Sequence, residues 1–195
     1  FIKIREKEFA TTSVREIARK TFELADGCLM SAKKDGLVNI GGLIALKGDK
    51  WLEDLRACMI FREGFPTYGG LAARDLEALA VGLEEVLDES YLDYRLAVSR
   101  YMGEGLNKLG IPTVQPIGGH AVFIDAKNFL SHIPVSEFPA QTLVRELYSR
   151  EGIRAAVVGD QLVRLAFPRR VYTQSHFDYV LEGFAELVAC KSELR

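Results

Sequence analysis

The sequence predicts an α/β protein in two parts, and three observations support this fold class. The apolar run Leu37–Leu46 is typical of a strand that is buried on both faces of a parallel or mixed sheet. Helical periodicity then dominates residues 71–109, and after Gly110 the pattern changes to short strands and amphipathic helices. We therefore expect the end of an α/β layer over residues 1–70, followed by a connecting helix and a smaller α+β domain over residues 71–195.

In the first part, residues 1–70, we expect two helices around the apolar strand. Thr12 and Ser13, followed by Glu16, form a capping-box start for a helix that is expected to end near Asp26 and Gly27. The apolar face of this helix is expected at Val14, Ile17, Phe22 and Leu24. A second helix is expected over Asp49–Cys58, and the glycine-rich stretch 64–70 is expected to be a loop.

The second part begins with a long helical region that should break near residues 88–90, and it continues with strands and helices. Strands are expected over Ile111–Ile117, Ala121–Asp125, Ile153–Val158 and Leu162–Phe167. Helices are expected over Phe138–Tyr148 and Thr173–Cys190, the latter with a buried face at Phe177, Val180, Leu181, Phe184 and Leu187. The turns are expected at Gly118–His120 and at Gly159–Gln161.

Composition narrows the function classes. The chain has 195 residues, 48% of them hydrophobic, and a net charge of -2. Its 25 basic and 27 acidic residues are interspersed, so neither a nucleic-acid partner nor a membrane partner is expected, and the expected compartment is the cytoplasm. Three widely spaced cysteines and three histidines argue against a disulfide framework or a zinc site. The chain starts at Phe1 without an initiator methionine, so we expect a fragment.

A pair of lysines next to a hydroxyl is the first candidate site. Ser31, Lys33 and Lys34 stand directly before the apolar run. At the edge of a buried strand, desolvation frees a lysine amine to attack carbonyl groups, while a hydroxyl and a second ammonium hold a phosphate. A basic surface loop is the commoner origin of so short a pattern.

Three further positions are candidates, each with a structural alternative. Arg164 interrupts an apolar strand, and either a bound carboxylate or a structural salt bridge would satisfy it. Glu63–Gly70, with Tyr68, could line a site or form a tight loop between helices. His120 follows two glycines, and a lone histidine is more often a hydrogen-bonded core residue than a catalyst.

Six separated segments carry a family pattern. They are residues 31–35 (SAKKD), 38–42 (VNIGG), 63–70 (EGFPTYGG), 118–121 (GGHA), 137–141 (EFPAQ) and 168–173 (PRRVYT). In this order they resemble the β-eliminating lyases, the family of tryptophanase and tyrosine phenol-lyase. The resemblance runs over essentially the whole chain and corresponds to the C-terminal half of the family's sequence.

The resemblance implies an aspartate-aminotransferase-like fold of type I, pyridoxal 5'-phosphate (PLP) as the cofactor, an activating potassium ion and a homotetramer. It implies that Lys34 is the lysine that forms a Schiff base with the cofactor, with Ser31 and Lys33 near the phosphate. By the same resemblance, the backbone carbonyl of Asn39 helps to hold potassium, and Arg164 binds the α-carboxylate of an amino-acid substrate.

The substrate is the point on which the family divides. Val158 stands where tyrosine phenol-lyases carry an arginine that recognises phenol, and Phe65 also resembles tryptophanase. Residues 26–28 and 37–42 look more like the phenol-lyase branch. Because an apolar group cannot pair with a phenolate, the resemblance favours β-elimination of L-tryptophan to indole, pyruvate and ammonia. Tyrosine or another β-substituted amino acid stays an alternative, as does a fragment that serves only as an oligomerisation module.

Two departures from the family pattern affect these expectations. Only residues 159–163 separate Val158 from Arg164, where family members have a longer insertion. The upstream half, which in the family supplies much of the cofactor site, is absent before Phe1. The resemblance therefore implies that this chain is inactive by itself and needs the N-terminal half of the subunit.

Overall fold

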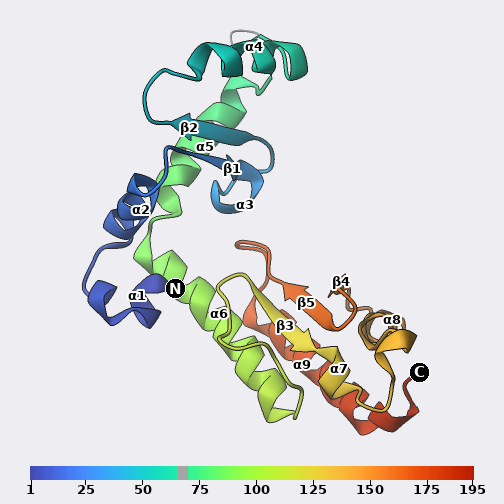
Figure 1. Ribbon diagram of the computed structural model, residues 1–195. Helices are drawn as coiled ribbons and strands as arrows, with labels where there is room; N and C mark the ends of the chain where they lie inside the picture. The colour runs from blue at the N-terminus through green and yellow to red at the C-terminus, as the bar shows by residue number, and fades with distance from the viewer. Residues whose placement is uncertain (66–69) are drawn as a thin grey trace. The chain divides into compact units, whose positions relative to one another are not determined.

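A computed structural model describes residues 1–65 and 70–195 and divides the chain into two compact units, Phe1–Leu92 and Asp93–Arg195. The division falls within helix α6 (Glu89–Lys108), and each unit is described here by itself (Figure 1). Helix α5 (Ala73–Glu85) packs on helix α3 (Ala32–Asp35), so it belongs to the first unit. The compact units therefore divide later than the expected boundary at residue 70. Their assignment to a cofactor domain and a small domain stays a prediction.

The first unit is a two-stranded antiparallel sheet with helices around it (Figure 1). In addition to α3 and α5, its elements are α1 (Ile2–Arg5), a 3₁₀ turn (Lys7–Phe9), α2 (Val14–Glu23), β1 (Gly27–Ser31), β2 (Gly42–Leu46) and α4 (Leu52–Arg62). Ser13 caps α2 as expected, because its hydroxyl accepts a hydrogen bond from the Glu16 backbone N–H at 3.2 Å. Of the expected apolar face of α2, Ile17 is buried while Phe22 and Leu24 are exposed.

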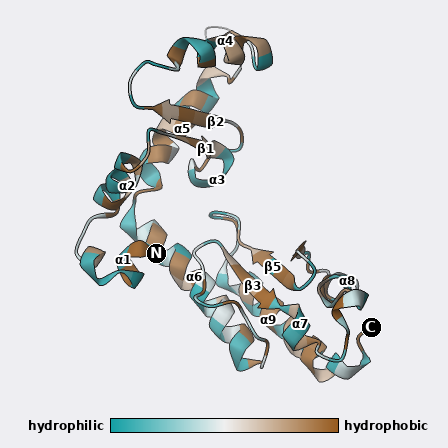
Figure 2. Ribbon diagram, viewed as in Figure 1, coloured by the Kyte–Doolittle hydropathy of each residue, from teal (hydrophilic) through white to brown (hydrophobic). Residues whose placement is uncertain are grey.

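The expected doubly buried strand over Leu37–Leu46 is wrong in extent and in burial. Leu37 has a positive φ of 56°, which interrupts the extended backbone, and β2 starts only at Gly42. Figure 2 shows that β1 and β2 are largely hydrophobic, yet Leu29 is 83% exposed and Ile44 is 60% exposed. A sheet of two strands cannot bury both of its faces unless further layers cover it, and the described residues of this unit do not supply them.

The second unit is a three-stranded antiparallel sheet in the order β3-β5-β4, with helices packed on one face (Figure 1). In addition to the C-terminal part of α6, its elements are β3 (Ala121–Asp125), α7 (Ala126–Phe129), a 3₁₀ turn (Val135–Glu137), α8 (Pro139–Glu151), β4 (Ala156–Val158), β5 (Leu162–Ala166), α9 (Gln174–Ala189) and a 3₁₀ turn (Lys191–Glu193). The break between α5 and α6 and the turn at 159–161 confirm the sequence predictions.

One continuous core holds the second unit together. The inward side chains of the sheet include Val122, Ile124, Val163 and Leu165, and they pack with Phe184 of α9 and other buried residues of α6 to α9. The expected buried face of α9 is confirmed, with Thr173 as the N-cap. Gly152 ends α8 with a φ of 66°, a left-handed conformation that glycine adopts without strain.

The expected strand over Ile111–Ile117 is only partly formed. The Val114 N–H donates to the Phe123 carbonyl at 2.8 Å, and the Asp125 N–H donates to the Pro112 carbonyl at 2.9 Å. The segment nevertheless forms a single bridge, from Thr113 to Ile124, rather than a regular strand. Its two prolines lack the N–H that a regular ladder requires. Across the described ranges 1–65 and 70–195, no helix is both long and apolar enough to cross a membrane.

Candidate functional site

The lysine pair lies on the short helix α3, which connects β1 to β2. Ala32 is fully buried and anchors this helix, and its N–H donates to the Gly41 carbonyl at 3.0 Å. Lys33 and Lys34 are both exposed. The expected desolvation of Lys34 at a buried strand edge is therefore wrong for this chain, because neither neighbouring strand contains a buried residue.

Three unused polar groups are close together in sequence at α3. Ser31 occupies the N-cap position, but its side chain makes no capping hydrogen bond. Neither Lys33 nor Lys34 forms a hydrogen bond or ion pair with any residue that the structure describes. One hydroxyl and two primary amines are thus available to a ligand that carries a carbonyl and a phosphate.

The backbone after Lys34 packs very closely against α5. Gly36 and Gly82 are both buried, and a Cβ atom on Gly82 would overlap the carbonyl oxygen of Gly36. Leu37, with its positive φ, donates its N–H to the Lys34 carbonyl at 3.2 Å. The sequence analysis missed Gly82, although a lone glycine inside a helical pattern is a signal of close packing.

Arg164 lies on the outer face of the second unit's sheet. It is exposed, and its register partners are Phe123 on β3 and Ala156 on β4. The side chains alternate along β5, so that Val163 and Leu165 enter the core while Arg164 does not. Arg164 forms no ion pair or hydrogen bond with a described residue, so the salt-bridge alternative has no support.

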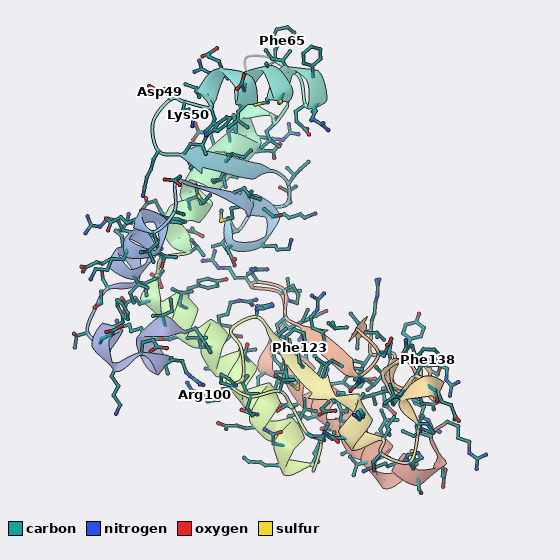
Figure 3. The ribbon with its side chains drawn as sticks, viewed as in Figure 1. Asp49, Lys50, Phe65, Arg100, Phe123 and Phe138 are labelled. Carbon is teal, nitrogen blue, oxygen red and sulfur yellow. The ribbon has the colours of Figure 1, made fainter. Side chains whose placement is uncertain are left out.

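The structure brings Val158 and Arg164 onto the same sheet face. Val158 pairs with Leu162, two positions before Arg164 on β5, and it is 39% exposed. Residues opposite or diagonal to one another on one face are within reach of long side chains. Phe123 lies on β3 in the same row (Figure 3). This outer row, formed by Phe123, Ala156, Val158 and Leu162 around Arg164, is largely apolar. Asp125 of β3 pairs with Leu162 on the same face, and its carboxylate accepts hydrogen bonds from Asn128.

The short connection between Val158 and Arg164 forms a regular hairpin. Val158 and Leu162 pair directly, and residues 159–161 make the turn. Gly159 has a φ of 61°, which a three-residue hairpin loop requires of one of its residues. The two strands are therefore compatible with the short loop in this sequence.

The remaining predicted positions have different outcomes. His120 is exposed, so a core role is wrong, and its carbonyl accepts a hydrogen bond from the Phe167 N–H. Phe65 is 46% exposed beside the end of α4 (Figure 3), and Tyr68 lies outside the described residues. Asn39 is exposed. No group of three or more His, Cys, Asp or Glu side chains in the described ranges could hold a metal ion. The predicted potassium contact uses the backbone carbonyl of Asn39, so it stays a prediction.

The electrostatic shifts of the second unit lie outside this outer row. Hydrogen bonds from Arg150 and then from Arg145 hold the pKa of Glu146 below its ordinary value. A hydrogen bond from the Tyr101 hydroxyl to Asp178 raises the pKa of Tyr101. These groups stabilise the helices that carry them, and the candidate site depends on exposed lysine and arginine side chains instead.

Comparison with known proteins gives a consistent family. Residues 9–182 match a family model described as "Beta-eliminating lyase". A tryptophanase from Salinibacter ruber is 54% identical over 210 residues, which cover 100% of this chain and 45% of that protein. A tyrosine phenol-lyase from Symbiobacterium thermophilum is 48% identical over 92% of this chain and 43% of its own length. The chain thus spans less than half the length of these relatives.

Solved structures support the predicted fold. A serine palmitoyltransferase from Sphingomonas wittichii superposes with a TM-score of 0.60 at 13% identity, over 88% of this chain and 41% of that one. An aspartate aminotransferase from Thermotoga maritima gives 0.59 at 13% identity, over 84% and 40% of the two chains. Both have the type I fold, so the predicted aspartate-aminotransferase-like fold is confirmed. Because the family model matches most of the residues, the chain belongs to the β-eliminating lyase family.

Proposed function

We propose that this chain is part of a PLP-dependent lyase that splits L-tryptophan into indole, pyruvate and ammonia. The observation that supports this substrate best is the outer row of the second unit, where the Arg164 cation shares one sheet face with apolar Val158. The 54% identity with a tryptophanase agrees with this choice. Because the match covers 45% of that relative, we propose the activity for a complete subunit and not for this chain alone.

The groups present at α3 fit PLP in their chemistry. Lys34 Nζ is the amine that would bind the cofactor's aldehyde carbon, and Ser31 Oγ with Lys33 Nζ would hold the phosphate. When bound, PLP supplies an electron sink for the negative charge that is left at the substrate's Cα. The Lys34 amine can then accept the proton from Cα. Lys34 is exposed in this chain, and the rest of the complete subunit would have to cover it.

Arg164 is suited to orient the substrate. Its planar guanidinium can donate two parallel hydrogen bonds to an α-carboxylate, and the residues directly opposite it, Phe123 and Ala156, offer no side-chain acceptor. Such a charge-assisted pair is worth about 1.5–3 kcal/mol.

Val158 supports indole as the leaving group over phenol. Its side chain has no polar atom with which to pair a phenolic hydroxyl, and a buried hydroxyl that is left without a partner costs about 1–3 kcal/mol. Indole presents mostly apolar surface to such a side chain. Phe65 is proposed as a second contact of the aromatic group.

Further parts of the proposal concern the complete protein. We place a potassium ion at the Asn39 backbone carbonyl, a homotetramer as the assembly and the cytoplasm as the compartment. The remainder of the subunit would supply the cofactor contacts that this chain lacks. The 195-residue chain alone is expected to be inactive.

The proposal is tested by incubating the complete purified subunit, with PLP and potassium, with L-tryptophan and L-tyrosine separately. We expect indole and pyruvate from tryptophan, and tyrosine turnover at least about tenfold slower. Phenol without indole would reject the tryptophan assignment in favour of the tyrosine alternative. Turnover of neither, but of a β-substituted serine or cysteine, would identify another β-eliminating lyase.

The non-enzymatic alternative needs a separate experiment. A complete subunit that binds PLP through Lys34 absorbs visible light, and Lys34→Ala should remove this absorbance. A preparation that is colourless after incubation with PLP and removal of the unbound cofactor would reject the enzyme and leave the oligomerisation module.

A further inference from the structure

The turn that follows the lysine pair combines two unusual backbone features. Leu37 adopts a left-handed φ of 56°, which a branched side chain rarely accepts. Directly before it, Gly36 is buried, and a Cβ there would lie 2.6 Å from the Ala32 carbonyl oxygen and 2.9 Å from Leu79 Cδ1. Strained and tightly packed backbone of this kind persists only where its surroundings hold it, and it is common at functional sites.

Helix α5 holds this turn by direct backbone contact. Gly82 presents no side chain to the Gly36 carbonyl, and a Cβ at position 82 would overlap that oxygen and lie 3.4 Å from Leu37 Cβ. The obstructing atom belongs to the backbone, so it cannot rotate away as the end of a side chain could. Any larger residue at position 82 must therefore displace α5 or the turn itself.

The turn is linked to the lysine by a hydrogen bond. The Leu37 N–H donates to the Lys34 carbonyl oxygen at 3.2 Å, and at the other end of α3 the Ala32 N–H donates to Gly41. The Lys34 side chain forms no hydrogen bond or ion pair with residues 1–65 or 70–195. The backbone of α3 sets where the Lys34 side chain starts and along which Cα–Cβ bond it leaves the helix, and the turn that packs on α5 holds that backbone.

We propose that Gly82 is a positioning residue for Lys34, because it lets α5 clamp the Gly36–Leu37 turn and so orients the lysine toward its ligand. The inference rests on the proposed role of Lys34 and adds a residue that touches neither cofactor nor substrate. Leu79 completes the clamp through its side chain. The chemistry of Lys34 is expected to depend on this close approach of Gly82 to the Gly36 carbonyl.

The test compares Gly82→Ala with Val81→Ala in the complete subunit. Val81 is 56% exposed and next to Gly82 on α5, so its truncation is a matched control. Each protein is treated with PLP, reduced with borohydride and digested, and the labelled lysine is identified by mass spectrometry. We expect the labelling rate at Lys34 to fall by at least about tenfold in Gly82→Ala and to stay within about twofold in Val81→Ala. Equal labelling of Gly82→Ala and wild type, with equal melting temperatures, would overturn the proposal.

A second variant decides the case if Gly82→Ala does not fold. Leu37→Gly adds no bulk and removes the strain at a left-handed position. It should fold, but its looser turn should lower the ratio of Lys34 to Lys33 labelling by at least about threefold. An unchanged ratio would overturn the inference.

Amide hydrogen exchange separates this inference from the proposed function. It needs no cofactor, and we expect faster exchange over residues 32–37 in Gly82→Ala than in Val81→Ala. Faster exchange together with a wild-type subunit that takes no label at Lys34 would mean that the clamp exists but the proposed role of Lys34 is wrong, and the positioning role falls with it. Unchanged exchange in a folded Gly82→Ala subunit that labels normally would reject the clamp alone.

Discussion

The two units differ in how much of their apolar surface they bury for themselves. The second unit packs both of its long helices and one sheet face into a continuous core. In the first unit, the apolar side chains that the structure buries among its described residues are Ile17, Ala32 and Leu79. Phe61 on α4 is 90% exposed, and the strands around the lysine pair are exposed as well.

The extensive core and the candidate cofactor lysine therefore lie in different units. A unit that buries so little apolar surface cannot offset the conformational entropy of ordering its chain, so we expect the first unit to need further polypeptide. The candidate cofactor lysine nevertheless belongs to this unit. The second unit can fold around its own core and presents Arg164 and its apolar neighbours on the outer face.

The sharpest test of this difference between the units is a substitution that abolishes activity and leaves stability unchanged. Lys34→Ala should lower pyruvate release by the complete subunit by at least about 10³-fold, because the proposed base and cofactor link are lost. Its melting temperature without cofactor should change little, since the side chain is exposed. A large drop in thermal stability would show that Lys34 is a structural residue. Lys33→Ala removes a proposed phosphate contact but leaves the Lys34 amine, so it should lower the activity far less than Lys34→Ala, and excess PLP should restore it.

Core substitutions compare the two units directly. Phe184→Ala should lower the free energy of unfolding of the second unit by about 3–5 kcal/mol, because the ring is fully buried. Leu29→Ala on β1 should change the free energy of unfolding of the first unit by less than about 0.5 kcal/mol in this chain, because Leu29 is 83% exposed. Urea unfolding measures the free energy of unfolding of both variants and of the wild type.

The same pair of variants in the complete subunit sharpens the result. If further polypeptide covers β1, the cost of Leu29→Ala should rise above its value in this chain while that of Phe184→Ala stays the same. An unchanged, negligible cost for Leu29→Ala in both would contradict the dependence of the first unit on other parts of the protein.

A smaller effect is expected from the outer row of the second unit. Arg164→Gln should raise KM for the amino-acid substrate by roughly 10- to 100-fold, since a charge-assisted pair of about 1.5–3 kcal/mol is lost. Stability should not change, because Arg164 is exposed and makes no ion pair within the described residues. Steady-state kinetics of the complete subunit measure the effect, with Arg164→Lys as a variant that keeps the charge. An unchanged KM in Arg164→Gln would exclude the carboxylate role.

The smallest effect concerns pH and the helix α8. Arg150 and Arg145 lower the pKa of Glu146 in the folded protein. The unfolded chain lacks these contacts, so its Glu146 carboxylate has a higher pKa and binds a proton more readily. The stabilisation is complete above the ordinary pKa of glutamate, near 4.3, and is lost as the pH falls through the lower folded value. Glu146→Gln should therefore be less stable than wild type at pH 7 and approach it near pH 3.

Denaturant unfolding at the two pH values measures this difference. High salt should reduce the deficit of Glu146→Gln at pH 7, because the two arginine partners are partly exposed. A deficit that does not depend on pH would mean that Glu146 acts through packing rather than through its charge.

Local signals predicted the second unit well and the first unit poorly. Thr173, the apolar face of α9 and Gly152 mark their elements in sequence, and the structure has them close to the predicted places. The run Leu37–Leu46 has the composition of a buried strand, but Leu37 turns into the left-handed region and the sheet has only two strands. Burial depends on what packs from elsewhere, and a local pattern carries no information about that.

The sequence by itself determined the family pattern, the helices and strands of the second unit, and which residue types are available for chemistry. Those features depend on short-range periodicity, caps and turns, which neighbouring residues specify. Only the tertiary structure decided that Arg164 and Val158 share one outer sheet face, that Lys34 is exposed, and that Gly82 contacts the turn behind it. These facts follow from strand register and from the packing of distant segments, where a shift of one residue or one added methyl group changes the outcome.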